Sequence, residues 1–324
     1  MRVKAHRRGQ IFASDDYRHL HDSVGFAQSP QTLILGDRVR VYYSTRRVDP
    51  EGGKFRSIVA FVDFAHDLAE ILGHSRQPVL PLGRAGCFDE HGIFPFHPHR
   101  HGNRLLAFTS GWTRRASVSV DSGIGQVESF DGGATFDRSG DGPILAAGLH
   151  EPFLVGDPFV VSDEAGWDMW YIFGQRWMVP PEPSAEPERV YKIAHCWSQN
   201  GLDWQGRNRG AILPDELGAD ECQALPSVVR VAGGWLMVFC FREAIGFRSD
   251  PSRGYRLGAA FSADGRLWQR QKGSLQFQGA AGDWELKMQA YPHVFWLQDR
   301  LYLLYNGNEF GRYGFGLAEL QWES

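Results

Sequence analysis

The sequence predicts an all-β fold built from a fivefold repeat. Five prolines each open an apolar run, and they are separated by 65, 63, 68 and 66 positions: Pro30, Pro95, Pro158, Pro226 and Pro292. An aromatic residue stands thirteen positions after each proline, which gives a second series with the same spacing: Tyr43, Phe108, Tyr171, Phe239 and Tyr305. A fixed period of this length indicates supersecondary units that bury their apolar faces by stacking on their neighbours.

Each repeat is predicted to contain four strands. In the first, an apolar run begins at Pro30, a Gly36-Asp37 turn follows, and residues 38–45 alternate as a strand should. A third strand is expected over residues 57–63 and a fourth ends at Leu80, and similar signals return in the later repeats. Five units of four antiparallel strands predict a five-bladed β-propeller, an architecture in which radial repetition limits exposed strand edges.

The turns between third and fourth strands share a sequence pattern in the middle repeats. Residues Ser129 to Phe136 resemble the Asp-box turn of sialidases and other propellers, and shorter versions run from Ser198 to Trp204 and from Ser262 to Trp268. Asp, Asn and Gly suit such hairpins because the turn requires positive φ and a side chain that bonds its own backbone. We expect these residues to be structural.

A single domain is expected over residues 1–324, because the repeat continues from about residue 22 to the end without a break in composition. Residues 1–21 carry no repeat signal and are interpreted as a lead-in that can supply a closing strand to the last blade. A content of 43% hydrophobic and 13% aromatic residues suits many short aromatic strands. The Pro-rich stretch Val179 to Pro187 is expected to be a surface loop.

Charge and cysteine spacing narrow the class of function. The net charge is −4, with 34 basic and 38 acidic residues, which predicts no nucleic-acid or membrane-surface partner. Polar residues interrupt the basic N-terminus, so no signal peptide is expected. The cysteines show no Cys-x-x-Cys spacing, which argues against a zinc site or a redox pair. We expect a cytoplasmic protein with reduced thiols and no cofactor, and the oligomeric state stays open.

Candidate catalytic residues lie in the segments that enter the first strands, because a propeller brings these segments together on one face. Asp89-Glu90 and Asp220-Glu221 stand at the same offsets before their prolines, and Asp157 directly precedes Pro158. In an extended chain, alternate positions share a face, so Glu90, Glu221 and Asp157 are expected around one pocket. Converging carboxylates are what glycoside hydrolysis needs, one as acid and one as nucleophile or base.

Substrate-binding candidates stand just beyond the second strands or near the first. We expect them to hold sugar faces and hydroxyls: Arg46, Trp112, Trp177, Arg242, Lys287 and Tyr291. Lys287 occupies the same offset as Glu90 and Glu221, so an ion pair with one of them is predicted. The alternative is structural, since an Asp before Pro commonly caps a turn and an Asp-Glu pair in a loop is commonly solvated.

A series of histidines is compatible with a metal site. His97, His99 and His101 alternate, with His91 nearby, and alternation would place three imidazoles on one strand face. Pro98 and the turn at residues 100–103 place them at the outer end of a hairpin, away from the expected pocket. We therefore predict no metal site.

The chain resembles the five-bladed propeller glycosidases of glycoside hydrolase families 32, 43, 68, 117 and 130. It resembles more closely the uncharacterised glycosidase-like proteins encoded among bacterial polysaccharide genes. The segments that carry this resemblance are Gly156-Asp157-Pro158, Asp220-Glu221-Cys222, Leu303 to Asn308 and Tyr313 to Ala318.

The resemblance implies roles for particular residues. Asp157 matches the Asp-Pro that stabilises the transition state in family 32, and Glu221-Cys222 is similar to the Glu-Cys acid motif, although it stands farther from its proline. Families 32 and 43 place an Asp in the first blade as nucleophile or base, where this chain has Gln28-Ser29-Pro30. Asp22 or the Asp89-Glu90 pair would have to replace it.

The leading functional hypothesis is a glycosidase acting on an oligosaccharide or polysaccharide. Glu221 is expected to be the general acid, because its sequence neighbours are apolar, and Asp157 to stabilise positive charge on the sugar ring. A glycosyltransferase or phosphorylase on the same scaffold is the first alternative, with Lys287 and Arg242 holding a phosphate. A non-catalytic glycan-binding propeller is the second.

Overall fold

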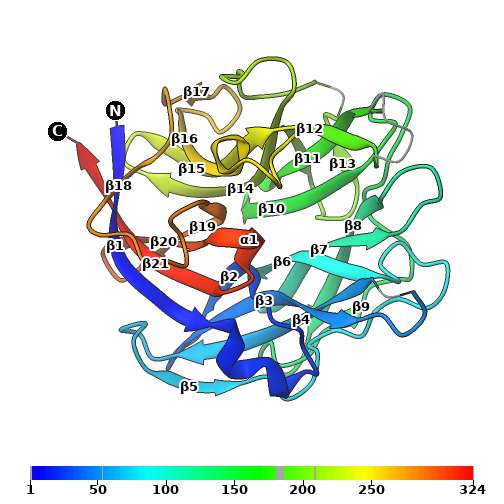
Figure 1. Ribbon diagram of the computed structural model, residues 1–324, viewed down its shortest axis with the longest axis horizontal. Coiled ribbons are helices and arrows are strands. Elements are labelled where there is room, and N and C mark those ends of the chain that lie inside the picture. The colour runs from blue at the N-terminus through cyan, green and yellow to red at the C-terminus, as the bar shows by residue number, and fades with distance from the viewer. Residues whose placement is uncertain (1, 53, 180–185, 208, 324) are drawn as a thin grey trace.

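The computed structural model describes residues 2–52, 54–179, 186–207 and 209–323, and it confirms the all-β class (Figure 1). Within these ranges the helical segments are short: η1 (Ser14–Leu20), η2 (Pro251–Arg253) and α1 (Asn308–Gly311). Most of the expected Pro-rich loop, residues 180–185, lies outside the described residues.

The strands form groups of four that follow the sequence repeat. The first group is β2 (Gln28–Ile34), β3 (Val39–Val48), β4 (Phe55–Phe64) and β5 (Ile71–His74). The second is β6 (Gly92–His101), β7 (Arg104–Thr113), β8 (Asp121–Ser129) and β9 (Asp137–Arg138). A single parallel bridge between Ser57 and Gly92 joins these two groups into one sheet.

Two further groups are separate four-stranded sheets. One contains β10 (Val155–Asp163), β11 (Gly166–Met178), β12 (Glu188–Ser198) and β13 (Trp204–Gln205). The other contains β14 (Glu221–Val231), β15 (Gly234–Glu243), β16 (Arg256–Ser262) and β17 (Gln269–Arg270).

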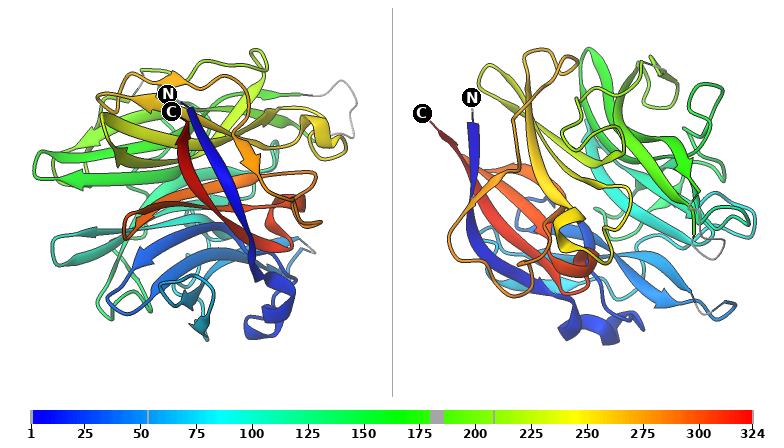
Figure 2. Two further views of the ribbon diagram at one scale, coloured as in Figure 1. Left: turned by 90° about the vertical axis from the view of Figure 1, so that its left-hand side faces the viewer. Right: turned by 45° about the horizontal axis from the view of Figure 1, so that its top comes forward.

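The last sheet combines the two ends of the chain. β19 (Ala290–Leu297), β20 (Arg300–Asn306) and β21 (Gly314–Glu323) are followed by β1 (Arg2–Ala13), which pairs antiparallel with β21. β18 (Gln276–Gln278) runs parallel to β1 at the outer edge. Figure 2 shows the two termini side by side. The lead-in segment thus supplies a strand to the sheet that contains the C-terminus.

The first strands of the groups, β2, β6, β10, β14 and β19, form a closed ring. Each contacts the next, β19 contacts β2, and all of them lie around the centre of Figure 1. In every one the strand register shifts at its proline, as a β-bulge does. The residue before the proline has a positive φ in four of them, at 51°, 51°, 48° and 55°: Ser29, Asp157, Leu225 and Tyr291. Non-glycine residues rarely adopt this conformation, so the repeated motif sets the direction of these side chains.

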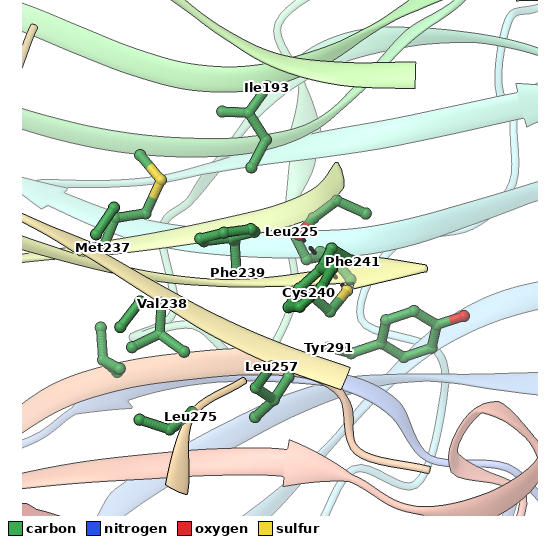
Figure 3. Close-up of a cluster of buried hydrophobic side chains, with 14 of the residues drawn as sticks. Ile193, Leu225, Met237, Val238, Phe239, Cys240, Phe241, Leu257, Leu275 and Tyr291 are labelled. Atoms are coloured by element: carbon green, nitrogen blue, oxygen red, sulfur yellow. Dashed lines mark hydrogen bonds between the residues drawn. The ribbon is translucent and has the colours of Figure 1, made fainter. Parts of the chain in front are cut away.

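The aromatic series of the sequence repeat lies in the core. Phe108, Tyr171, Phe239 and Tyr305 have no exposed surface, and Tyr43 is 4% exposed. Figure 3 shows Phe239 with Leu257 and Tyr291 in one cluster of buried side chains. Each strand group needs an apolar face against its neighbours, and this explains why one buried aromatic residue recurs in every repeat.

The predicted Asp-box turns are confirmed as structural. Asp131 Oδ1 accepts the Thr135 backbone N–H at 3.0 Å, and Ser129 Oγ accepts that of Gly133 at 2.8 Å. Asn200 and Asp264 bond the backbones of their own turns in the same way. These side chains therefore complete hairpins.

The state of the cysteines and the length of the helices can be compared with the sequence predictions. Cys87, Cys196, Cys222 and Cys240 are all free thiols. Within the described ranges, no helix has the length and apolar character required to cross a membrane.

Candidate functional site

An acid and an arginine pair in the same way in several strand groups. In each pair the acid precedes or begins the first strand and the arginine lies on or beside the fourth: Asp89–Arg138, Glu151–Arg207, Glu221–Arg270 and Glu285–Arg7. All four carboxylate side chains are at most 3% exposed. Each pair ties the entering segment to the outer strand of its own group, so the repetition indicates a structural role.

Glu221 belongs to this set and differs from the expected general acid. Its carboxylate accepts from Arg270 Nη1 at 2.6 Å, from Gln223 Nε2 at 2.9 Å, and from the backbone N–H of Glu216 at 2.9 Å and Leu217 at 3.0 Å. Burial acts to raise the pKa of Glu221, but these donors outweigh it and the pKa lies below its ordinary value. A carboxylate held ionised cannot donate a proton at neutral pH.

None of the other candidate acids in the described residues is hydrogen-bonded to Asp157. Asp89 is 2% exposed and is paired with Arg138, while the half-buried Glu90 accepts the Gly86 backbone N–H at 2.7 Å. Asp22 is exposed on a turn. In the part of the chain that the structure describes, no hydrogen bond or ion pair joins any of them to Asp157. Within the described ranges, Glu90 and Glu221 thus make their hydrogen bonds to groups other than Asp157.

The predicted ion pair of Lys287 with Glu221 or Glu90 is wrong. Its side chain is exposed, and among the described residues no ion pair links it to Glu221 or Glu90. Its backbone N–H donates instead to Asn308 Oδ1 at 2.8 Å. The segment before β19 contains turns, one of which is closed by a hydrogen bond from the Glu285 N–H to the Gly282 carbonyl oxygen. Because the chain is not extended there, alternate positions before the proline do not share one face.

Asp157 has the properties expected of an acid at the centre of the ring. It is 7% exposed, and its Oδ2 accepts the Leu225 backbone N–H of the neighbouring first strand at 3.2 Å. Burial raises the pKa of Asp157 to about 7, although the Leu225 N–H and the charge of Arg189 act to lower it. The side chain is therefore partly protonated near neutral pH.

Aromatic side chains surround this part of the ring. Tyr291 lies 5.0 Å from Phe94 and 5.6 Å from Tyr255, measured between ring centroids. The hydroxyls of Tyr255 and Tyr191 are hydrogen-bonded to each other. Among the residues directly before the five prolines, Asp157 is the single carboxylic acid.

Arginines add positive charge to the same face. Arg242 is 2% exposed, donates to the Tyr191 hydroxyl at 2.9 Å, and stacks over Phe247 at 3.5 Å from the ring centroid. Arg189 lies 5.9 Å from the Tyr191 ring. Arg46 donates to Gln28 Oε1 at 3.1 Å. Within the described ranges, none of these three guanidinium groups forms an ion pair with a carboxylate.

Sequence comparison connects the chain to proteins without an assigned activity. No family model matches it. The uncharacterised proteins MT1551 and Rv1502 of Mycobacterium tuberculosis, strains CDC 1551 and H37Rv, are each 32% identical over 321 residues, which covers 97% of this chain and 98% of theirs. The protein belongs to the family of these mycobacterial proteins.

Solved structures with this fold include carbohydrate-active enzymes. A glycoside hydrolase matches with a TM-score of 0.74 and 15% identity, covering 99% of this chain and 93% of the other. A thermostable family-43 glycoside hydrolase gives 0.61 and 14%, covering 92% and 89%. A β-1,2-mannobiose phosphorylase from Listeria innocua gives 0.67 and 12%, covering 100% and 97%. The resemblance to glycosidase-like propellers is confirmed at the level of fold.

Several of the predicted binding residues lie together. The charges of Arg46 and Arg242 both act to lower the pKa of Tyr291, which burial raises, so the three groups share one environment. Trp177 lies 5.9 Å from Arg189. Trp112 packs against Gly92, and its ring lies 6.0 Å from the His91 ring.

Sequence reasoning missed Arg189, Tyr191 and Tyr255. Arg189 and Tyr191 lie at the start of β12, and Tyr255 directly precedes β16. The third strand of an antiparallel group starts at the end where the first strand starts, so these positions reach the same face. Alternating Arg and Tyr at the start of the predicted third strand was the available signal.

The histidines join first strands to one another. His97 is buried, and its ring nitrogens lie 3.2 Å from Gln31 Oε1 of β2 and 3.1 Å from the Val160 carbonyl oxygen of β10. His99 and His101 both bond Ser162 Oγ. His97 therefore lies inside the ring, not at the outer end of a hairpin as expected. In the described part of the chain, no group of three His, Cys, Asp or Glu side chains could hold a metal ion.

Proposed function

We propose that the chain forms a single five-bladed β-propeller domain that cleaves a glycosidic bond in an oligosaccharide or polysaccharide, with Asp157 as general acid. The closed ring of first strands supports the blade count. The main support for this function is Asp157. Its carboxyl is buried at the centre of this ring, and its pKa is raised to about 7. A general acid works best when its pKa lies near the working pH.

The hydrogen bond from the Leu225 N–H gives the two carboxyl oxygens of Asp157 different roles. Oδ2 is held by the Leu225 N–H, and among the described residues Oδ1 has no hydrogen-bond partner. Oδ1 is thus the oxygen that would give its proton to the leaving glycosidic oxygen. Tyr291 and Phe94, 5.0 Å apart, supply ring surface for a sugar beside it.

Phosphorolysis is a second candidate, and the arginines favour it. Hydrolysis requires a second carboxylate to attack the sugar or to activate water. Among the described residues, no carboxylate is hydrogen-bonded to Asp157, whereas Arg46, Arg189 and Arg242 form no ion pair with a carboxylate and suit a phosphate. A phosphate oxygen would attack the anomeric carbon as the glycosidic bond breaks and Asp157 protonates the leaving oxygen. The products are a sugar 1-phosphate and a shortened glycan.

The proposal also includes a cytoplasmic location and a carbohydrate as the molecular partner. The four free thiols support the location, since disulfides are rare in that compartment. The fold shared with carbohydrate-active enzymes supports the partner.

The test is incubation of the purified protein with a panel of glycans, with and without inorganic phosphate. Sugar phosphate that forms only when phosphate is present supports phosphorolysis, and free reducing sugar formed in both conditions supports hydrolysis. If no glycan yields either product, the enzymatic proposal fails and a non-catalytic glycan-binding propeller takes its place.

A further inference from the structure

A groove with a cavity volume of about 880 Å³ lies beside the Asp157 site. Its walls are residues 247–251, residues 283–288, the segment around α1 and the end of β1. Figure 1 shows α1 next to the ring of first strands. A volume of this size suits a ligand larger than one sugar ring.

The groove shares a wall with the proposed site. Phe247 lines the groove, and the Arg242 guanidinium stacks on its ring, 3.5 Å from the ring centroid. Phe310 also lines it, and its ring lies 6.2 Å from that of Tyr255. The Phe310 carbonyl oxygen accepts from Gln28 Nε2 at 2.6 Å, and Gln28 in turn accepts from Arg46. The groove therefore continues the face on which the arginines lie.

Asn308 fixes the groove in one shape. Its backbone N–H donates to the Trp284 carbonyl oxygen at 2.7 Å, its Oδ1 accepts the Lys287 N–H at 2.8 Å, and its Nδ2 donates to the Asp283 carbonyl oxygen at 2.7 Å. Asn308 thus joins the wall at α1 to the wall at residues 283–288. A site formed before the ligand arrives loses less conformational entropy on binding.

The backbone of this wall is strained. Glu309 and Phe310 have φ of 52° and 59°, a conformation that costs about 1–3 kcal/mol for each non-glycine residue. Arg312 and the Tyr313 hydroxyl hold the Glu309 carboxylate at 2.8 and 2.9 Å. Strain that neighbouring contacts maintain is characteristic of ligand sites.

The lining suits a neutral, hydroxyl-rich ligand. Trp284, Phe310 and Tyr313 provide ring faces. The charged groups nearly balance, with Asp15, Asp283 and Glu309 against Arg248 and Lys287. Sugar rings combine apolar faces with a rim of hydroxyls, which matches aromatic rings between hydrogen-bonding groups. This lining differs from the unpaired arginines near Asp157.

We propose that the groove binds consecutive neutral sugar units of a glycan whose reacting end lies at Asp157. This inference rests on the proposed function. It defines the substrate as a neutral oligosaccharide of several units, because a disaccharide at Asp157 would leave the groove empty.

The test measures binding and cleavage separately. The full-length protein is applied to an array of neutral plant, fungal and bacterial oligosaccharides that includes β-1,2-mannobiose, and the best ligand is titrated by calorimetry. Tyr313→Ala removes an exposed ring from the groove, and Ser249→Trp fills the groove from an exposed position. Each is expected to weaken binding about tenfold or more. Their controls, Phe130→Ala and Leu149→Trp, change residues that are 79% and 88% exposed outside the groove.

The outcomes separate this inference from the proposed function. Binding of longer oligosaccharides that is lost in Tyr313→Ala and Ser249→Trp, and kept in the controls and in Asp157→Asn, supports the groove. If the array retains no oligosaccharide, or if the groove variants bind as the wild type does, the inference is overturned. If instead Asp157→Asn cleaves normally while Tyr313→Ala binds weakly, the groove stands and the role of Asp157 falls.

Discussion

Arg270 Nη1 lies 2.6 Å from Glu221 Oε1, and both side chains are at most 1% exposed. This ion pair joins the start of β14 to the outer strand β17 of the same group. Comparable pairs recur at Asp89, Glu151 and Glu285. Buried pairs of this kind contribute little net stability over apolar residues, but removing one partner leaves an uncompensated charge.

Replacing Arg270 by Met should therefore destabilise the protein by about 3–5 kcal/mol, because Glu221 would remain buried and ionised. Urea denaturation at pH 7 measures the change. The double variant Glu221→Leu/Arg270→Met is the control, and it should recover part of the loss. A loss below about 1 kcal/mol in the single variant would show that Glu221 can reach water, against the structural assignment.

His293 should make the fold sensitive to acid. It is 3% exposed, and burial lowers its pKa to about 3. Between the unfolded value of about 6.5 and the folded value the unfolded state binds more protons, so stability falls as the pH is lowered, by about 1.4 kcal/mol per pH unit. His293→Gln should reduce this slope in urea denaturation at pH 7, 6 and 5. The exposed His150→Gln serves as control, and equal slopes in all three proteins would refute the assignment.

The repeat made most of the fold predictable. Each first strand contains the same bulge at its proline, and each second strand buries the same aromatic, so a single period located both. The site was less predictable because the entering segments contain turns. Glu221 begins β14, and its carboxylate accepts the backbone N–H groups of Glu216 and Leu217 in the turn that precedes the strand, a contact that the spacing of the acids from their prolines did not predict.

A sequence signal for the structural acids was nonetheless present. An arginine closely follows the aromatic that ends each Asp-box turn, at Arg138, Arg207 and Arg270. In the last four groups, an acid before or at the start of the first strand and an arginine on or beside the fourth strand form a repeated pair, and repetition indicates architecture. Among the described residues, Asp157 has no arginine partner, which distinguishes it from Asp89, Glu151, Glu221 and Glu285.

Inorganic phosphate should stabilise the protein if the arginines near Asp157 bind it. A ligand at a hundred times its Kd raises the free energy of unfolding by about 2.7 kcal/mol. Melting temperatures are compared in phosphate and in chloride of equal ionic strength. The shift should disappear in Arg46→Met and Arg189→Met and remain in Arg84→Met, whose side chain is 78% exposed and pairs with Asp141. An unchanged shift in the first two variants would exclude this anion site.

Asp157 should lower stability at alkaline pH. Its folded pKa of about 7 exceeds its ordinary value of 3.8, so the folded state binds more protons between these values. Stability therefore falls as the pH rises through that window and stays low above it, by up to about 4 kcal/mol. Asp157→Asn remains neutral and can still accept the Leu225 N–H. It should melt at a higher temperature than wild type at pH 8 and close to wild type at pH 4, whereas a lower melting point at pH 8 would indicate a stabilising carboxylate.

The most direct test is the pH dependence of kcat/KM for wild type and Asp157→Asn on the best glycan, with phosphate present. The wild-type rate should fall above pH 7, because the general acid then loses its proton. Asp157→Asn should be slower by about a hundredfold to ten-thousandfold at every pH while remaining folded. An Asp157→Asn protein that cleaves the glycan at the wild-type rate would contradict the central claim that Asp157 is the general acid.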